Sequence, residues 1–525
     1  MPVNKDSAFD LKLPLLFFAL FFLFFKLDTH PIIETTEARY VEISREIVSY
    51  GDWVLPRFNG ICHLHKPPMV YWYGALFLRF FGSNEVACRV ANATAAMAMV
   101  FFLYLYLYTF YCESLALLGA WVLLTGTGFL ALARGFSTDM LFSLLWLICH
   151  FFLYKFSQTK KDAALFFAYL FLSLAFLTKG PVIFLLIFYF AIFALRKNSL
   201  RDYLSSTGIL LFIILGCSWY LFLVWRNPEV LNYFVFHQTW ERMATDVHKR
   251  TGPFYYFFLI LPAVLIPYAF FFIQGLYLLI KDGTEKFSLE ILWLILPFII
   301  FSINSSKLPT YMLPLLPPAA IIIAWSVKTS IDRNKNGILS ASFIFPILFA
   351  LLFLIPEKAL PGTVTRNFFL YLSPCLLFII VAGITFSLKG NLKVSFFLLS
   401  LTGPVFISNV LFNMKDIAEF HDLSVKRYAL VAMKKPSKKV LFYGTHNGGM
   451  PFYLKKLVPM LATARTEFFP RQKYKYMQIP EKDYFKDSKD PCFIFLKNKT
   501  LGNNQALFKD FKIILQGKKF ALLER

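Results

Sequence analysis

The sequence lacks the cysteine patterns that define disulfide-rich or zinc-binding proteins. Its seven cysteines, at positions 62, 88, 112, 149, 217, 375 and 492, include no CxxC pair and fall mostly inside apolar runs. Cysteine in such surroundings usually behaves as a small buried hydrophobic residue. The pattern therefore predicts neither a disulfide framework nor a zinc finger.

Nucleotide-binding glycine motifs, internal repeats and low-complexity linkers are also missing. The glycine-rich stretch at 444–449, GTHNGG, lacks the spacing of a Walker or Rossmann loop, and we interpret it as a turn. No small-residue cleavage site precedes Asp28. We therefore expect the first apolar run to be a retained membrane span and not a removed signal peptide.

What the chain has in excess is apolar surface. It is 58% hydrophobic and 19% aromatic, with 64 Phe in 525 residues and a mean hydropathy of +0.58, whereas soluble domains are roughly 45–50% apolar. These values predict a polytopic α-helical membrane protein. Thirteen segments are candidate spans: 13–27, 86–111, 115–134, 139–155, 163–178, 181–195, 205–225, 254–280, 289–304, 311–327, 338–355, 368–388 and 394–413.

Basic residues concentrate in alternate loops, which should therefore be cytoplasmic. The opposite loops then face outward, and they hold nearly all the unusual polar residues: 28–85, 136–139, 178–181, 226–253, 304–310 and 356–367. Thirteen spans also place everything after Met414 outside. This distribution favours a single outward-facing site over a transporter or flippase, which would carry repeated halves and ionisable residues near the bilayer midplane.

The last part of the chain, 414–525, is predicted to form a small soluble α/β or α+β domain after a membrane domain at 1–413. Strands are expected at 440–444, 492–498 and 512–524, the last as a hairpin, with a helix at 424–433. This tail has 23 Lys/Arg and 10 Asp/Glu within a whole-chain net charge of +23. In a membrane protein such a surplus suits anionic lipid head groups or phosphates better than nucleic acid.

The longest polar segment before the tail is 31–72. A helix is expected from Thr35 or Thr36 to Gly51, with one apolar stripe and with Glu42, Arg45 and Glu46 pairing on another face. We interpret it as an amphipathic helix on the membrane surface. A surface helix without chemistry fits the same pattern.

The second half of that segment holds His63, His65 and Lys66 before Pro67 and Pro68. A lysine fixed by two prolines at membrane depth is a good ligand for a lipid phosphate, and two histidines two residues apart could bind a metal. The alternative is an interfacial anchor, with the lysine snorkelling above an aromatic belt.

The whole stretch ETTEARYVEISREIVSYGDWVLPRFNGICHLHKPPMVYW resembles the first periplasmic loop of bacterial GT-C membrane glycosyltransferases, especially aminoarabinose lipid A transferases and relatives in the protein O-mannosyltransferase superfamily. Further family-like motifs follow in order in loops placed outside. They are RGFSTDM at 134–140, LTKGP at 177–181, HQTWER at 237–242 with RTGPFYY at 250–256, and SSKLPTY at 305–311. The match covers roughly residues 10–415.

The resemblance implies a GT-C fold with periplasmic juxtamembrane helices in the bacterial inner membrane, and transfer of a sugar from an undecaprenyl-phosphate carrier with inversion. Carried over position by position, Lys66, Lys179 and Arg242 hold the carrier phosphate. Lys307 and Tyr311 line the same cavity, and Asp139 positions the acceptor or the sugar amine. Fixed cations from separate loops are what a phosphate in lipid requires.

Two positions depart from the family pattern. The first family acid is replaced by Thr36, so Glu34 or Glu37 is left as the candidate general base, and the sequence does not choose between them. The glutamate that binds metal in the aminoarabinose enzymes is replaced by His65, which with His237 could still hold a divalent ion, zinc or magnesium.

The function expected from the resemblance is transfer of 4-amino-4-deoxy-L-arabinose to lipid A by a protein acting as a monomer among membrane lipids. Transfer of a lipid-linked hexose or mannose to another glycan or to a protein is the nearest alternative. Two hypotheses come from other functional classes: a transporter of lipid-linked sugars, and a lipid-binding scaffold without catalysis.

Overall fold

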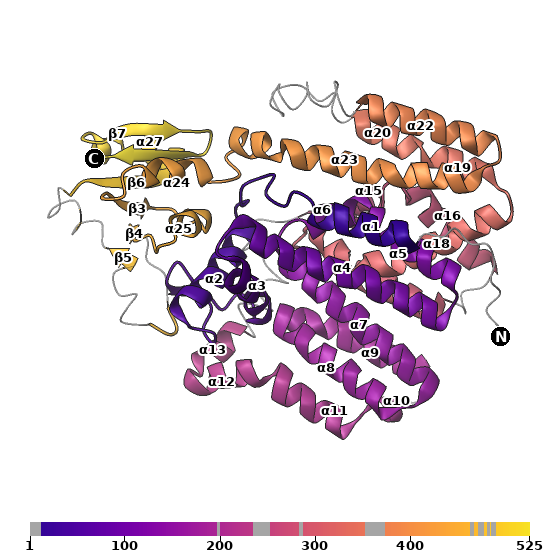
Figure 1. Ribbon diagram of the computed structural model, residues 1–525. Coiled ribbons are helices and arrows are strands. Elements are labelled where there is room, and N and C mark those ends of the chain that lie inside the picture. The colour runs from indigo at the N-terminus through magenta and orange to yellow at the C-terminus, as the bar shows by residue number, and fades with distance from the viewer. Residues whose placement is uncertain are drawn as a thin grey trace. The chain divides into compact units, whose positions relative to one another are not determined.

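The computed structural model of the protein describes residues 12–196, 200–234, 252–282, 287–351, 373–462, 467–470, 477–479, 484 and 490–525. The chain divides into two compact units (Figure 1). A helical unit comprises Met1–Phe25, Asn92–Ile355 and Arg366–Val410. A sheet unit comprises Lys26–Ala91, Pro356–Thr365 and Leu411–Arg525.

The helical unit is built from apolar helices, of which α7 and α8 pack side by side along much of their length (Figure 1). Two helices, α4 and α23, continue into the sheet unit. The α-helices are α1 (Lys12–Phe24), α4 (Glu85–Phe110), α5 (Glu113–Thr125), α6 (Thr127–Ala133), α7 (Thr138–Thr159), α8 (Asp162–Lys179), α9 (Ile183–Arg196), α10 (Leu200–Tyr203), α11 (Ser206–Leu211), α12 (Ser218–Arg226), α13 (Glu229–Asn232), α15 (Tyr256–Val264), α16 (Ala269–Asp282), α17 (Ser288–Ile303), α18 (Leu316–Asp332), α19 (Asn336–Ser342), α20 (Ile344–Leu351), α22 (Ser373–Leu388) and α23 (Leu392–Phe420). Short 3₁₀ or π segments are η1 (Gly180–Val182), η2 (Phe212–Gly216) and η5 (Pro309–Leu315).

Each of the thirteen expected spans contains helix within the described residues. Five helices in this part of the chain are long and apolar enough to cross a membrane, or eight if each bent helix pair counts as one span. The remaining apolar helices are shorter. A polytopic helical architecture is therefore present, and the number thirteen stays a prediction.

Three expected spans are bent rather than straight. The chain turns by 63° between α5 and α6, by 50° before α12, and by 110° between α15 and α16. Gly126 lies at the first break and Pro267 at the third, and both residue types interrupt helices. The sequence prediction missed these bends because each segment reads as one continuous apolar run.

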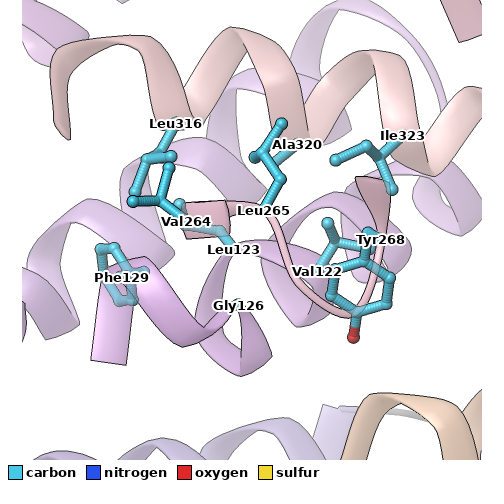
Figure 2. Close-up of a pocket in the computed structure, with 10 residues that line it drawn as sticks. All are labelled: Val122, Leu123, Gly126, Phe129, Val264, Leu265, Tyr268, Leu316, Ala320 and Ile323. Atoms are coloured by element: carbon cyan, nitrogen blue, oxygen red, sulfur yellow. The ribbon is translucent and has the colours of Figure 1, made fainter. Parts of the chain in front are cut away.

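The α5–α6 and α15–α16 breaks lie against each other and are joined by hydrogen bonds. The Thr127 amide donates to the Ile266 carbonyl at 3.0 Å, and the Thr125 and Tyr268 hydroxyls lie 2.5 Å apart. Backbone groups freed by a break in an apolar segment need such partners. Figure 2 shows the small, mainly apolar pocket at this junction, which Val122, Leu123, Gly126, Phe129, Val264, Leu265, Tyr268, Leu316, Ala320 and Ile323 line.

The sheet unit begins with the first loop and ends with the tail. Its helices are α2 (Thr36–Tyr50), α3 (Met69–Phe81), α24 (Lys426–Met433), α25 (Gly449–Leu454) and α27 (Asn498–Asn503), with the 3₁₀ turn η9 (Gln505–Phe508). A two-stranded ladder in the first loop pairs β1 (Arg57–Phe58) with β2 (Ile61–Cys62). The tail strands are β3 (Lys439–Tyr443), β4 (Met460–Leu461), β5 (Gln478–Ile479), β6 (Cys492–Lys497), β7 (Lys512–Gln516) and β8 (Phe520–Glu524).

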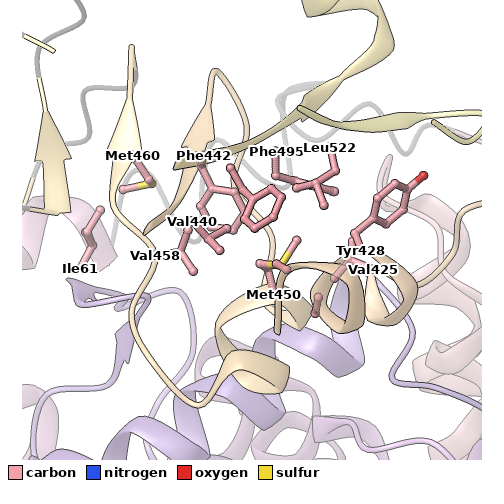
Figure 3. Close-up of a cluster of buried hydrophobic side chains, with 13 residues drawn as sticks. Ile61, Val425, Tyr428, Val440, Phe442, Met450, Val458, Met460, Phe495 and Leu522 are labelled. Carbon is pink, nitrogen blue, oxygen red and sulfur yellow. The ribbon is translucent and has the colours of Figure 1, made fainter. Parts of the chain in front are cut away.

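The tail strands form one mixed sheet in the order β5-β4-β3-β6-β8-β7. Strand β3 pairs in parallel with β4 and β6, and β7 and β8 form the antiparallel hairpin that the sequence predicts. One face packs on Val425, Tyr428 and Met450 from the α24 and α25 segments (Figure 3). The strands and the helix expected in the tail are present, although the boundary at 413/414 stays a prediction.

The first loop packs directly on the tail within this unit. The Asn59 side chain donates to the Val458 carbonyl at 2.7 Å and accepts from the Val458 amide at 2.8 Å. The Gly449 amide donates to the Glu34 carboxylate at 2.7 Å. The glycine-rich turn at 444–449 is thus the part of the tail that receives the start of the first loop.

Glycine is required at position 449 by this close approach. A Cβ there would lie 2.5 Å from Glu34 Oε1 and 2.7 Å from Val425 Cγ2, both shorter than van der Waals contact. We expect Gly449→Ala to lower the free energy of unfolding by about 1–3 kcal/mol, measured by thermal unfolding of the purified protein.

The matched control is Gly502→Ala in α27, where a Cβ would meet no heavy atom within 4 Å. Alanine favours helix over glycine, so this variant should be neutral or stabilised by up to about 1 kcal/mol. Equal effects of the two substitutions would contradict the packing argument.

Candidate functional site

The helical unit brings Asp139 and Lys179 together as a buried ion pair. Asp139 lies in the first turn of α7, where its amide donates to the Ser137 hydroxyl at 3.3 Å. Lys179 is the last residue of α8, and its Nζ donates to Asp139 Oδ1 at 2.5 Å. Both residues are buried. Two loops that are 40 positions apart in sequence therefore form one charged centre.

This centre continues to Tyr311 and Lys307 through aromatic rings. Lys179 Nζ lies 5.2 Å from the centroid of the Tyr311 ring, a distance at which a cation is attracted to the ring face. The Tyr311 ring lies 5.3 Å from Phe301 and 6.4 Å from Phe257, and Lys307 Nζ lies 5.4 Å from the Phe257 centroid. Asp139 and Lys179 are thus linked to Tyr311, and Tyr311 is linked to Lys307 through Phe257. That these residues line one cavity stays a prediction.

Lys307 is held by the end of helix α17. Its Nζ donates to the carbonyls of Ser302 at 2.5 Å and Phe301 at 3.2 Å, where the helix dipole favours a cation. Burial lowers the pKa of Lys307. In this conformation Lys307 ties the segment that leads into η5, which carries Tyr311, to the end of α17, so we assign it a supporting position in the cluster.

Two predicted site residues, His237 and Arg242, lie outside the described residues. Their assignments rest on sequence alone.

In the sheet unit, Lys66 is half-buried at the entry to α3, whose first helical residue is Met69. Pro67 and Pro68 are buried and fix the chain before the helix. Helix α3 packs on α2, with the Tyr40 and Tyr71 rings 5.7 Å apart. The packing of α2 and α3 therefore fixes the segment around Lys66.

The predicted metal site has few donors in the described part of the chain. The rings of His63 and His65 stack with centroids 4.1 Å apart, an arrangement that suits ring packing more than convergence on one ion. No group of three or more His, Cys, Asp or Glu side chains able to hold a metal occurs among the described residues. The predicted partner of His65, His237, lies outside the described residues, so the metal site stays a prediction.

Glu34 is engaged with the tail. Its carboxylate accepts from the amides of Gly449 at 2.7 Å and Gly448 at 3.4 Å, at the start of α25. Burial raises the pKa of Glu34 to about 7, an effect that these two hydrogen bonds and Arg39 partly oppose. This carboxylate links the first loop to the tail.

Glu37 is engaged with Arg89 of α4. Arg89 Nε donates to Glu37 Oε1 at 3.0 Å, and its NH2 group donates to Oε2 at 3.3 Å. The Ile33 amide also donates to Glu37, at 2.9 Å. Although burial alone would raise the pKa of Glu37, Arg89 and its hydrogen bonds bring the pKa below its usual value. Glu37 is a charged structural partner here.

Helix α2 ends at Gly51 as predicted, in a left-handed conformation with φ of 71°, but Thr35 makes no side-chain cap. A helix lying on the membrane surface would leave its polar face open to solvent, whereas the polar face of α2 is buried. Arg45 donates to Glu42 at 2.6 Å as expected, yet both side chains are buried. Glu46 is buried as well, because it accepts from the Gly60 amide at 3.0 Å and from the Asn59 amide. The first-loop ladder covers this face.

Sequence reasoning missed two arginines that hold these loops. Arg89 lies in a span-like apolar segment, and Arg134 belongs to the RGFSTDM motif without an assigned role. Arg134 donates to the carbonyls of Phe22 and Phe25 at 2.8 Å each, at the end of α1. An arginine in an apolar stretch signals a buried partner, but the spacing does not say which one.

The raised pKa of Glu34 predicts a pH-dependent stability. Because the folded chain binds this proton more tightly than the unfolded chain, whose glutamate has a pKa near 4.5, the stabilisation is complete below about pH 4.5 and is lost as pH rises through about 7. Glu34→Gln keeps an acceptor for Gly449 but removes the titration.

We therefore expect the unfolding temperature of the native protein, relative to that of Glu34→Gln, to fall between pH 5 and pH 8. The measurement is thermal unfolding of both proteins across this range in one buffer series. A constant difference across the range would show that Glu34 does not titrate there.

Comparisons with known proteins agree with this architecture. Residues 65–225 match the dolichyl-phosphate-mannose-protein mannosyltransferase family. The undecaprenyl phosphate-alpha-4-amino-4-deoxy-L-arabinose arabinosyl transferase of Aeromonas hydrophila is 31% identical over 349 residues, covering 62% of this chain and 60% of that protein. Transferase 1 of the same name from Pseudomonas fluorescens is 28% identical over 351 residues, covering 65% and 64%. The matched region thus spans a little under two thirds of these relatives.

Among solved structures, ArnT from Cupriavidus metallidurans bound to undecaprenyl phosphate superposes with a TM-score of 0.84 at 20% identity, covering 98% of this chain and 97% of that one. At this identity the likeness establishes the fold. Together, the fold and the sequence matches confirm the resemblance to GT-C membrane glycosyltransferases of the aminoarabinose-transferase type that the loop motifs indicate.

Proposed function

We propose that the protein transfers a sugar from an undecaprenyl-phosphate-linked donor to an acceptor at the outer face of the bacterial inner membrane, with 4-amino-4-deoxy-L-arabinose as the sugar and lipid A as the acceptor. The observation that carries this proposal is the similarity over about 350 residues to undecaprenyl phosphate-alpha-4-amino-4-deoxy-L-arabinose arabinosyl transferases. The resemblance of the fold to a chain bound to undecaprenyl phosphate supports the choice of carrier.

The carrier phosphate is assigned to lysine and arginine side chains of separate loops. Lys179 is buried and already paired with one carboxylate, so it is fixed in place before any phosphate arrives. Lys66 supplies a second ammonium group at the rigid entry to α3. Arg242, which lies outside the described residues, is assigned to the carrier phosphate from the sequence alone. Fixed cations that stabilise the charge developing on the leaving phosphate are the main contribution that this chain can make to the reaction.

The contacts of the three candidate carboxylates support Asp139 as the one nearest the chemistry. Glu34 accepts from backbone amides of the tail and Glu37 is paired with Arg89, so each already has a structural task. Asp139 shares its cluster with Lys179 and Tyr311. A phosphate acceptor needs little help from a base, whereas a hydroxyl acceptor needs a carboxylate to take its proton.

Transfer of another lipid-linked sugar to a glycan or protein uses the same donor chemistry and is the second candidate, favoured by the family match at 65–225. The decisive experiment incubates the purified protein in detergent with labelled undecaprenyl-phosphate aminoarabinose and lipid A. Label in lipid A supports the first candidate, and transfer only from a mannosyl or hexosyl carrier supports the second. Donor binding without any transfer would overturn both, and transfer in detergent excludes a transporter.

Lys66→Ala should lower kcat/KM in this assay by about 10- to 100-fold, because a charge-assisted hydrogen bond to phosphate is worth about 1.5–3 kcal/mol. The control is Lys512→Ala, which removes an equally charged, exposed lysine at the start of β7. Wild-type kcat/KM in Lys66→Ala would refute the assignment of Lys66 to the donor phosphate.

Among the carboxylates, Asp139→Asn should lower kcat more than Glu34→Gln or Glu37→Gln, by about 100-fold or more if a proton is transferred. Unfolding temperatures recorded on the same samples separate loss of chemistry from loss of structure, since Lys179 and Arg89 each lose a charged partner. If a well-folded Glu34→Gln variant loses more kcat than Asp139→Asn, the general base is Glu34 in the first loop and not Asp139.

A further inference from the structure

The turn between β7 and β8 presents two exposed lysines, Lys518 and Lys519, beside the end of α23. Lys518 Nζ lies 3.2 Å from the centroid of the Phe420 ring, and Phe420 is the last residue of that helix. Asn498, which follows β6, donates its amide to the Lys519 carbonyl at 2.9 Å. The turn is therefore fixed to the point where the last apolar helix ends.

A buried aspartate holds this turn in place. Asp422 is 2% exposed and accepts from the Lys519 amide at 2.7 Å, from Arg427 at 2.5 Å and from the Tyr428 hydroxyl at 3.0 Å. At Gly517 a Cβ would lie 2.3 Å from Asp422 Oδ2. The turn thus contacts Asp422 through its backbone, at Gly517 and at the Lys519 amide. The side chains of Lys518 and Lys519 take no part in this contact.

The length of α23 places its end in a lipid head-group layer. The helix has 29 residues, which span about 43 Å at 1.5 Å per residue. A bilayer including both head-group regions is about 40–45 Å thick. Lys389 precedes the helix and Lys393 lies in its first turn, where basic residues are common at a membrane surface. A helix that begins in one head-group layer therefore ends in the other, at Phe420.

The charge at this end of the sheet is not neutralised within the described part of the chain. Lys497 ends β6 next to the turn, and no described carboxylate pairs with Lys497, Lys518 or Lys519. Asp422 is already paired with Arg427, and the nearby acids Asp416 and Glu419 share the last turns of α23 with Lys415.

At the opposite ends of the strands, several lysines are paired with carboxylates. There, Glu524 pairs with Lys435 and with Lys438 at 2.9 Å, and Asp490 lies 3.8 Å from Lys439. Lys497, Lys518 and Lys519 therefore differ from Lys435, Lys438 and Lys439 in having no described carboxylate partner.

We propose that the β7–β8 turn, through Lys518 and Lys519 with Lys497 beside them, binds the phosphate groups of anionic lipid head groups in the layer where α23 ends. The turn anchors the tail to the membrane surface. This assignment needs only the end of α23 and the charge of the turn, so it holds whichever sugar and acceptor the protein uses.

The test compares hydrogen–deuterium exchange of the full-length protein in nanodiscs of phosphatidylcholine alone and of phosphatidylcholine with 30% phosphatidylglycerol. Peptides covering 516–520 should exchange at least about fivefold more slowly with the anionic lipid, since each of the two lysines near such a surface contributes up to about a fivefold effect on binding. The protection should disappear in the double variant Lys518→Gln/Lys519→Gln and at high salt.

The matched control is Lys434→Gln/Lys439→Gln, which removes the same charge from the opposite end of the sheet and should keep the protection. Equal exchange in the two lipid compositions would overturn the proposal, as would equal loss of protection in both double variants. Protection by inorganic phosphate in pure phosphatidylcholine nanodiscs would identify a site for soluble anions instead. Unchanged unfolding temperatures of the variants establish that the turn is still folded.

Discussion

The sheet unit depends on how one buried guanidinium is satisfied. Arg89 has no exposed surface, and a charge removed from water is tolerated only when it is paired and hydrogen-bonded. It donates to the carbonyls of Leu27, His30 and Pro31 and to the carboxylate of Glu37. A single side chain on α4 therefore fixes the exit from the first apolar segment and the start of α2, and the course of the first loop follows from these two points.

The same requirement separates carboxylates that shape the protein from one that is available for chemistry. Glu34, Glu37, Glu42 and Glu46 all lie on or beside α2, and each has backbone amides or an arginine as its partner. Asp139 is also paired, but its partner is a lysine that faces the aromatic rings of Phe142 and Tyr311. An incoming phosphate can compete with Asp139 for that lysine, whose other described neighbours are aromatic rings and not buried backbone carbonyls. Drawing Arg89 away would instead remove the arginine partner of Glu37 and a buried donor to the carbonyls of Leu27, His30 and Pro31.

Much of the architecture could be predicted from the sequence, because membrane helices and hairpins leave strong local signals. Long apolar runs predict the helices, and short apolar runs predict the strands of the tail. The Gly-Lys turn predicts the hairpin. The cluster of Asp139, Lys179, Tyr311 and Lys307 was predicted through motifs, since each lies in a loop on the same predicted face.

What could not be predicted depends on partners distant in sequence. The face of α2 with Glu42 and Glu46 looks exposed by spacing, and only the turn at Asn59 and Gly60 reveals that it is covered. The role of the GTHNGG turn is invisible for the same reason, because its amides meet a carboxylate more than 400 positions earlier. The helix breaks near Gly126 and Pro267 were missed because hydropathy measures composition and not direction.

The pairing of Asn59 with Val458 joins residues 399 positions apart. During synthesis at about 5–20 residues per second, the first loop emerges roughly 20–80 seconds before the tail segment with which it pairs. Until then the side chains of Asn59 and Glu34 lack their partners in the tail, while the apolar segments between the first loop and the tail are inserted one after another. Because the chain grows from its N-terminus, the first loop cannot form its contacts with the tail until the tail has been synthesised. Folding of the tail is therefore the step that completes the structure of the first loop.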